Sequence, residues 1–184
     1  LNLNFEDALI DLQLSVQIDP NDSEKYMALG YLKSYFLGKD KEALIDLNKS
    51  IIIDPENSLA YLFRGWVNSY ISSDLQKKGN LRKSIQFMNL AINDYSKSIE
   101  FYNEKINPFY KRLFPFGYLH QIYAERGFSH QEVGIMNKNN GNKEFFKQSI
   151  YAAIDDYDTF IKYAPTISDV EDLKKTSKVF QHDF

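Results

Sequence analysis

A five-residue sequence, Ala-Leu-Ile-Asp-Leu, occurs twice in this chain, at residues 8–12 and again at residues 43–47. The two copies lie about 35 residues apart, and the Asp19-Pro20 pair that follows the first copy returns in the same register as Asp54-Pro55. A period in the mid-thirties is typical of stacked helical repeats, in which each unit buries its apolar face only against its neighbours. The repeat therefore predicts an all-α solenoid.

Two looser copies of this sequence begin at Ala91 and Ala153. In each of the four copies, the residues four and seven positions after the alanine share its helical face. We therefore expect the copies to occupy equivalent helices. The residues at these two positions are Leu12 and Ser15, Leu47 and Ser50, Tyr95 and Ser98, and Tyr157 and Phe160.

A second motif alternates with the first and consists of a tyrosine, three residues, a glycine and an aromatic residue. It occupies residues 26–31, 61–66 and 123–128. A glycine inside a helix costs about 1 kcal/mol relative to alanine, so three glycines in register need a structural reason. We expect close contact with a neighbouring helix at each of them. Each repeat would then pair a first helix that carries the glycine motif with a second helix that carries the alanine motif.

This arrangement resembles the tetratricopeptide repeat, a helix–turn–helix unit of about 34 residues. The resemblance implies a right-handed superhelix whose first helices line a concave surface. Arg64 and Arg126 stand where the family usually has a leucine, and Asn103 stands where the third unit should have its proline. The matching residues are Tyr26, Leu29, Gly30, Ala43, Leu47, Ser50 and Pro55, then Tyr61, Gly65, Ala91, Tyr95 and Ser98, and finally Tyr123, Gly127, Ala153, Tyr157, Phe160 and Pro165.

The spacing between the two motifs divides the chain into unequal units within a single domain. The glycine-to-alanine interval is longer in the two later units, and Ser72-Ser73-Asp74, Gly79-Asn80 and residues 137–142 are typical of loops. We therefore expect enlarged loops between the two helices of both later units. The expected parts are a half repeat with only a second helix (1–22), repeats at 23–57, 58–104 and 118–165, a linker (105–117) and a C-terminal capping helix (166–184).

Composition and motifs point away from catalysis and cofactors. The chain has no cysteine, its three histidines lack the spacing of zinc ligands, and no nucleophile elbow or phosphate-binding loop occurs. We therefore expect neither enzymatic activity nor a metal or cofactor. A net charge of −3 argues against nucleic-acid binding, and no apolar run is long enough to cross a membrane. The absence of cysteine slightly favours a cytoplasmic location, which otherwise stays open.

Charged residues recur at repeat spacing. Arg64 and Arg126 each precede a repeat glycine, while Asp46, Asp94 and Asp156 each follow a repeat alanine by three positions. The arginines could bind an anion. However, buried charges need partners, so we favour structural ion pairs. We expect Arg64 to pair with Asp46 or Asp94, and Arg126 with Asp94 or Asp156.

Aromatic residues supply the candidate binding site. Tyr31, Trp66 and Phe128 directly follow the repeat glycines, and Tyr35 and Tyr70 lie one helical turn further on. The resemblance places such residues on the concave surface, where they would form an aromatic ladder that binds a protein or peptide. Alternatively, they pack between adjacent first helices.

Two other functions stay open from the sequence. The chain could be a scaffold that self-associates through its N-terminal edge, or a regulatory or recruiting fragment of a larger multidomain protein. The half repeat leaves part of its helix without a covering partner. We expect the exposed apolar residues there to be among Leu1, Leu3, Phe5, Leu9 and Val16.

Overall fold

The computed structural model describes residues 4–102 and 119–163, and these residues form helices and turns without a strand. The prediction of an all-α fold is confirmed. The predicted linker, Pro165 and the capping helix lie outside the described residues. The helices are α1 (Phe5–Ile18), α2 (Ser23–Tyr31), the π-helix η1 (Leu32–Phe36), α3 (Asp40–Ile53), α4 (Ser58–Lys77), α5 (Leu81–Glu100), α7 (Leu119–Asn139) and α8 (Lys143–Tyr163).

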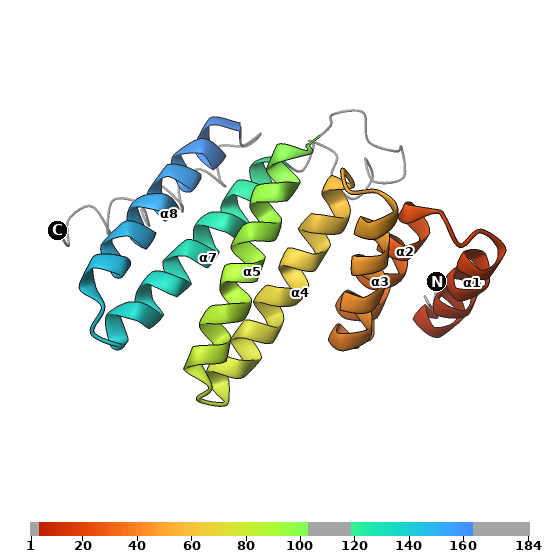
Figure 1. Ribbon diagram of the computed structural model, residues 1–184, viewed down its shortest axis with the longest axis horizontal. Coiled ribbons are helices and arrows are strands. Elements are labelled where there is room, and N and C mark those ends of the chain that lie inside the picture. Colours follow the sequence, from red (N-terminus) through yellow and green to blue (C-terminus); the bar gives the residue numbers. More distant parts are fainter. Residues whose placement is uncertain (1–3, 103–118, 164–184) are drawn as a thin grey trace.

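The helices lie side by side in one row from α1 to α8 (Figure 1). Antiparallel hairpins form between α2 and α3, between α4 and α5 and between α7 and α8, and successive hairpins pack through the α3–α4 and α5–α7 contacts. Each element therefore contacts mainly its neighbours in the row, which is the arrangement of an α-solenoid.

Polar side chains and prolines define where the helices begin and end. Asp22 caps α2 by accepting a hydrogen bond from the backbone N–H of Glu24 at 2.9 Å, and Asn57 caps α4 by accepting one from Ala60 at 3.0 Å. Caps of this kind satisfy backbone donors that have no partner within the helix. Pro20 and Pro55 follow the ends of α1 and α3, as predicted.

The prediction of enlarged loops between the paired helices is wrong. Helix α4 continues through residues 72–74, and only Lys78, Gly79 and Asn80 separate it from α5. Ser72, one of the serines predicted to lie in a loop, faces the neighbouring helix: its Oγ donates to the carbonyl of buried Ser84 at 2.8 Å, and Ser84 Oγ donates back to the carbonyl of Ser72 at 2.9 Å. The extra residues therefore lengthen both helices instead of the loop. Helix α7 likewise extends to Asn139, inside the second predicted loop.

The repeat glycines allow the paired helices to approach closely. A Cβ atom added to Gly65 would lie 2.5 Å from Cε1 of Tyr95, and one added to Gly127 would lie 2.9 Å from Cε1 of Tyr157. Both tyrosines are buried. The glycine of each first helix therefore makes room for the side chain four positions after the alanine of its second helix. In the preceding hairpin, Leu47 occupies the same place against Gly30.

The largest hydrophobic cluster spans α2 to α5 and reaches Ile122 of α7. Phe63 and Tyr95 are the largest side chains at its centre, and both are almost completely buried. Because this cluster crosses from one hairpin to the next, it fixes the relative positions of the first helices α2 and α4, which carry most of the predicted aromatic site.

The N-terminal edge differs in detail from the prediction. Leu9 is buried, Val16 packs beside it, and Phe5 stacks on Phe36 with ring centroids 4.2 Å apart. These residues face α2 and η1, so they do not form the exposed edge; Leu1 and Leu3 lie outside the described residues. The exposed apolar side chains of α1 are instead Ile10, Leu14 and Ile18. We call these three residues the α1 stripe.

Candidate functional site

A shallow depression lies where the α2–η1 segment meets α4. Four of the five aromatic residues predicted for the site line it, and Phe128 does not. We call this hollow the aromatic depression. Its lining residues are Tyr31, Ser34, Tyr35, Phe63, Trp66, Val67 and Tyr70.

Helical spacing brings these aromatic side chains together. Tyr31 and Tyr35 are four positions apart along the α2–η1 segment, and Trp66 and Tyr70 are four apart on α4, so each pair shares one helical face. Phe63 joins the two helices, because its ring lies 4.6 Å from that of Tyr31 and 5.3 Å from that of Trp66. Stacked and tilted rings at these separations are favourable aromatic contacts.

The depression is layered from a buried floor to an exposed rim. Phe63 forms the floor and is only 1% exposed, and Tyr31 and Trp66 are partly buried above it. Tyr35 and Tyr70 form the rim, with 57% and 47% of their surfaces exposed. The inner rings therefore pack against the core, while the two outer tyrosines keep about half of their surfaces exposed.

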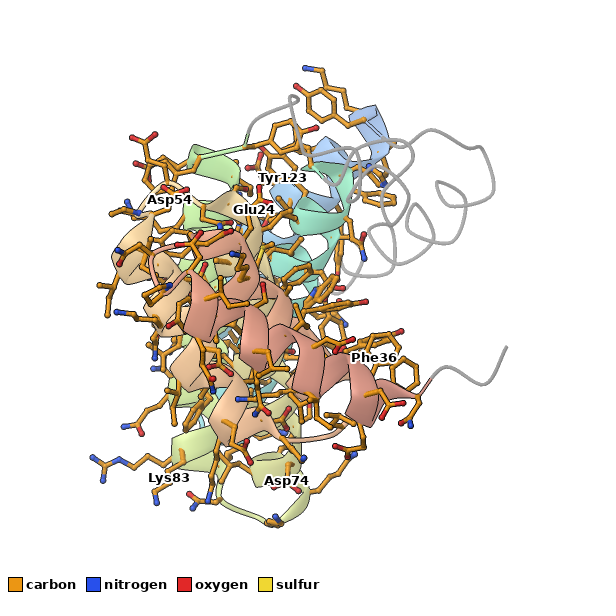
Figure 2. All side chains as sticks on the ribbon, turned by 90° about the vertical axis from the view of Figure 1, so that its right-hand side faces the viewer. Glu24, Phe36, Asp54, Asp74, Lys83 and Tyr123 are labelled. Carbon is orange, nitrogen blue, oxygen red and sulfur yellow. The ribbon has the colours of Figure 1, made fainter. Side chains whose placement is uncertain are left out.

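The depression lies near Phe36, away from the turn that follows α3 (Figure 2). Phe36, whose ring meets that of Tyr35 edge-on at 4.9 Å, lies on one side in Figure 2, and Asp54, just after α3, lies on the other. Phe128 is exposed on α7, which packs against α5 and α8. It therefore does not extend the depression between η1 and α4.

A carboxylate that the sequence analysis did not select lies beside the depression. Glu125 of α7 lies near the side chain of Trp66. Burial raises the pKa of Glu125, and the neighbouring indole of Trp66 partly opposes that shift. The charge of Glu125, after burial itself, helps to raise the pKa of Tyr70. Glu125 therefore lies near two aromatic residues of the depression.

A second carboxylate lies two turns along the same face of α7. Burial raises the pKa of Glu132, and the side chain of Gln76 on α4 partly opposes that shift. Glu125 and Glu132 thus lie near α4 at two levels. Both carboxyl groups are partly buried, and burial disfavours their ionised form.

The raised pKa of Glu125 predicts how stability depends on pH. A carboxyl group that holds its proton more tightly in the folded chain than its ordinary pKa of 4.5 favours folding as it becomes protonated. Its contribution should therefore increase as the pH falls from 7 towards 4.5. Glu125→Gln should be more stable than the wild type at pH 7, and the difference should shrink at lower pH. Urea denaturation at several pH values measures the stability difference between the variant and the wild type and its dependence on pH.

The matched control for this experiment is Glu56→Gln, because Glu56 lies exposed in the turn before α4. A surface substitution of this kind should change stability by less than about 0.5 kcal/mol. A Glu125→Gln variant that differs from the wild type by the same amount at every pH would contradict a raised pKa at Glu125.

The repeat arginines and aspartates form two equivalent ion pairs. Arg64 donates to Asp94 from Nε at 3.0 Å and from a terminal nitrogen at 2.6 Å. Arg126 meets Asp156 in the same way, at 2.9 and 2.5 Å. Both aspartates are only 2% exposed. The second terminal nitrogen of each arginine reaches back to the preceding second helix, to Asn48 from Arg64 at 2.6 Å and to Ser96 from Arg126 at 3.1 Å.

Asp46 has a different partner, which the sequence analysis missed. Lys33 of the π-helix donates to Asp46 at 2.6 Å, and both side chains are largely buried. The second unit (residues 23–57) has Leu29 at the position of the arginines. Arg64 and Arg126 come one position before their repeat glycines, whereas Lys33 comes three positions after Gly30. The charged partner of Asp46 is therefore supplied by a later position of the first helix than in the other two units.

The described residues hold no group of three or more histidine, aspartate or glutamate side chains that could bind a metal. A larger hollow of about 680 Å³ lies where the N-terminal end of α3 meets the extended α4–α5 hairpin. Its wall carries Asp40, Glu42 and Asp74 together with Lys39, Lys41 and Lys78. Because acidic and basic side chains alternate along this wall, it favours neither an anionic nor a cationic ligand. Across the described ranges, no helix is long and apolar enough to span a membrane.

Comparisons with known proteins give only distant structural similarity. The sequence matches no protein-family model and no curated protein. A structure titled "Crystal structure of MamA" is 18% identical and has a TM-score of 0.41, with 87% of this chain and 92% of that chain covered. The structure titled "Human IFIT1 dimer with PPP-AAAA" is 15% identical with a TM-score of 0.30, and the match covers 97% of this chain and 43% of the other. These values are too low to assign the function or the partner of either protein to this chain.

Proposed function

We propose that this chain is a non-enzymatic interaction module, built from tetratricopeptide-like units, that binds a peptide or an extended segment of a partner protein at the aromatic depression. Four aromatic side chains from two neighbouring first helices converge there, and two of them are exposed at the rim. A contiguous exposed aromatic surface usually marks a binding site.

The observation that carries this proposal is the exposure of Tyr35 and Tyr70 above a rigid floor. Phe63 holds the two helices together, so the rim tyrosines sit on regular structure and not on a loop. Aromatic residues held in this way are the commonest energetic centres of protein interfaces, because they bury a large area at a low cost in conformational entropy.

A selection from a displayed library of random peptides tests the proposal. We expect the full chain to enrich peptides that lose affinity about 30-fold or more, roughly 2 kcal/mol, for the Tyr35→Ala/Tyr70→Ala variant. The control is Ile45→Ala/Ile52→Ala, because these large apolar side chains are even more exposed and lie on the second helix α3. Affinity is measured by calorimetry, and circular dichroism checks that each variant is folded.

Two results would refute peptide binding at the depression. One is a selection that enriches no peptide above the background of an unrelated protein. The other is a set of peptides that bind the Tyr35→Ala/Tyr70→Ala variant as tightly as the wild type and lose affinity for the α3 control instead.

The α1 stripe supports self-association as a second candidate function. Ile10, Leu14 and Ile18 are all more than half exposed and recur at every fourth position of one helix. If two copies associate through this stripe, the mean mass from light scattering should rise with concentration, and Leu14→Glu should return it to the monomer value. A mass that stays monomeric at high concentration would contradict this candidate.

A further inference from the structure

Two aspartates of α1 occupy positions that are paired with a lysine in the next unit. Asp7 and Asp11 align with Glu42 and Asp46 of α3, because the alanine motif of α1 returns in α3 in the same register. Lys33 of the first helix before α3 lies 3.8 Å from Glu42 and 2.6 Å from Asp46. No first helix precedes α1 in the described residues. Asp7 and Asp11 therefore lack this lysine there, and both are exposed.

These two aspartates lie on the same face of α1 as the α1 stripe. Residues three or four apart share a helical face, and Ile10 and Leu14 each follow one of the aspartates by three positions. The opposite side of α1, where Leu9 is buried, packs against α2 and η1. The outward face of α1 therefore combines an apolar stripe with two acidic groups, and α1 contains no lysine or arginine.

The large hollow between the N-terminal end of α3 and the α4–α5 hairpin offers a complementary surface. We call it the hairpin hollow. The hairpin extends beyond the end of α3 (Figure 1), and Leu44, Ile71, Leu75 and Phe87 supply the apolar lining there. On the other side of the hairpin, Met136 of α7 packs into a cluster with α5. The volume of about 680 Å³ lies within the range of ligand pockets, about 300–1,000 Å³.

Four lysines line the hairpin hollow, and two of them are already paired. Lys39 and Lys78 form salt bridges within the chain at 3.9 and 2.6 Å. The three acidic residues of the wall also each have a partner in the chain. Lys41 and Lys83 are exposed and have no acidic partner among the described residues. A small ion finds both charges on this wall, whereas a helix with an apolar face and two carboxylates matches both the lining and the two lysines.

A smaller hollow between α5 and α8 occupies the equivalent place in the next repeat and has a volume of about 220 Å³. Asn89 and Phe145 stand there in the register of Lys41 and Lys83. No lysine lines this second hollow. An acidic helix would therefore be attracted to the hairpin hollow in preference to its counterpart.

We propose that α1 of one copy of this chain docks in the hairpin hollow of another copy. The α1 stripe then covers the apolar lining, and Asp7 and Asp11 pair with Lys41 and Lys83. This inference rests on the second candidate function, self-association, and names the surface that receives the α1 stripe; it does not involve the aromatic depression. Because the two surfaces are unlike, the contact builds a chain of copies unless two copies exchange α1 helices and close as a dimer.

Charge reversal in the full chain tests this contact. Lys41→Glu/Lys83→Glu should raise the dissociation constant of self-association about tenfold or more, because like charges would then face each other. Asp7→Lys/Asp11→Lys should have a similar effect. Combining all four changes restores the net charge of the wild type and the complementary charges, so the dissociation constant should return close to the wild-type value. Sedimentation velocity over a range of concentrations measures it, and circular dichroism checks the fold.

The matched control is Lys49→Glu/Lys143→Glu, which makes the same change in net charge at two exposed lysines outside both hollows. It should associate about as tightly as Lys41→Glu/Lys83→Glu does not, namely close to the wild type. Because Lys41 and Lys83 are exposed, their reversal should leave the fold intact. This variant therefore decides the test even if Asp7→Lys/Asp11→Lys destabilises α1.

The outcomes separate this inference from the other proposals. Self-association that Lys41→Glu/Lys83→Glu weakens no more than the control would overturn docking in the hairpin hollow and place the α1 stripe against another surface, such as the stripe of a second copy. A combined variant that folds but does not recover would overturn the proposed charge pairs. A monomer at every concentration would refute self-association itself. None of these results bears on peptide binding at the aromatic depression, which the peptide selection tests separately.

Discussion

Replacing Arg64 with methionine is expected to lower the free energy of unfolding by about 3–5 kcal/mol, because it leaves a buried carboxylate without its charged partner. Asp94 is 2% exposed and receives hydrogen bonds from Arg64 and from Asn68, the latter at 2.9 Å. Burial raises the pKa of Asp94, and Arg64 is the main group that opposes this shift. Methionine retains an apolar stem of similar shape, so the loss reports mainly on the charge and its hydrogen bonds. Urea denaturation followed by circular dichroism measures it.

The matched control is Asp74→Ala, which breaks the ion pair between Asp74 and Lys78 on the surface. That pair is as short as the Arg64 pair, at 2.6 Å, but both of its side chains are more than half exposed. An exposed pair of this kind contributes less than about 1 kcal/mol. If Arg64→Met costs no more than Asp74→Ala, the Arg64–Asp94 pair is not structural, and a role for Arg64 in binding an anion becomes the better interpretation.

Replacing Phe63 with alanine is expected to cost about 3–5 kcal/mol of unfolding free energy, because it opens a cavity at the centre of the largest cluster. Phe63 is 1% exposed and stacks on Tyr31 across the boundary between the first two hairpins. The same change should remove the floor of the aromatic depression. Thermal and urea denaturation of the full chain measure the loss.

Tyr35→Ala provides the comparison, because this rim residue is exposed and should change stability by less than about 1 kcal/mol. The two variants therefore separate the floor from the rim. If Tyr35→Ala destabilised the chain as much as Phe63→Ala, the rim tyrosine would belong to the core, and it would be a poor candidate for binding a partner.

Much of the architecture follows from the spacing of small and large residues. Gly65 precedes Ala91 and Tyr95 in the sequence, and the structure sets the tyrosine ring against the missing Cβ of the glycine. A local pattern of this kind predicts which helices pair, because the close approach requires both residues. Prolines 20 and 55, which cannot continue a helix, also predict where the helices before them end.

The loops were harder to predict, because serine suits both a turn and a tight helix contact. Ser72 and Ser84 form reciprocal hydrogen bonds between α4 and α5, and nothing local distinguishes them from serines of a turn. The π-helix and the Lys33–Asp46 pair depend on how α2 meets α3, which is a tertiary feature. Neither leaves a periodic signal in the sequence.

The candidate site was predictable only in part. The aromatic residues after the repeat glycines pointed to Tyr31 and Trp66, but Phe128 belongs to a more distant helix and does not join them. Glu125 was missed although a signal was present, namely its alignment with Phe63. A charged residue at a repeat position that is otherwise apolar can be recognised from the sequence. Which side chains of α4 lie near it can be known only from the structure.

The most direct test of peptide binding at the aromatic depression uses Trp66, which is the only tryptophan in the chain. Its indole lines the depression, so its fluorescence should respond to a ligand that binds there. Titration of the full chain with a selected peptide that lacks tryptophan should change the emission of Trp66 and saturate at the dissociation constant measured by calorimetry. Heat of binding with no change in Trp66 emission would place the peptide elsewhere and contradict the proposal.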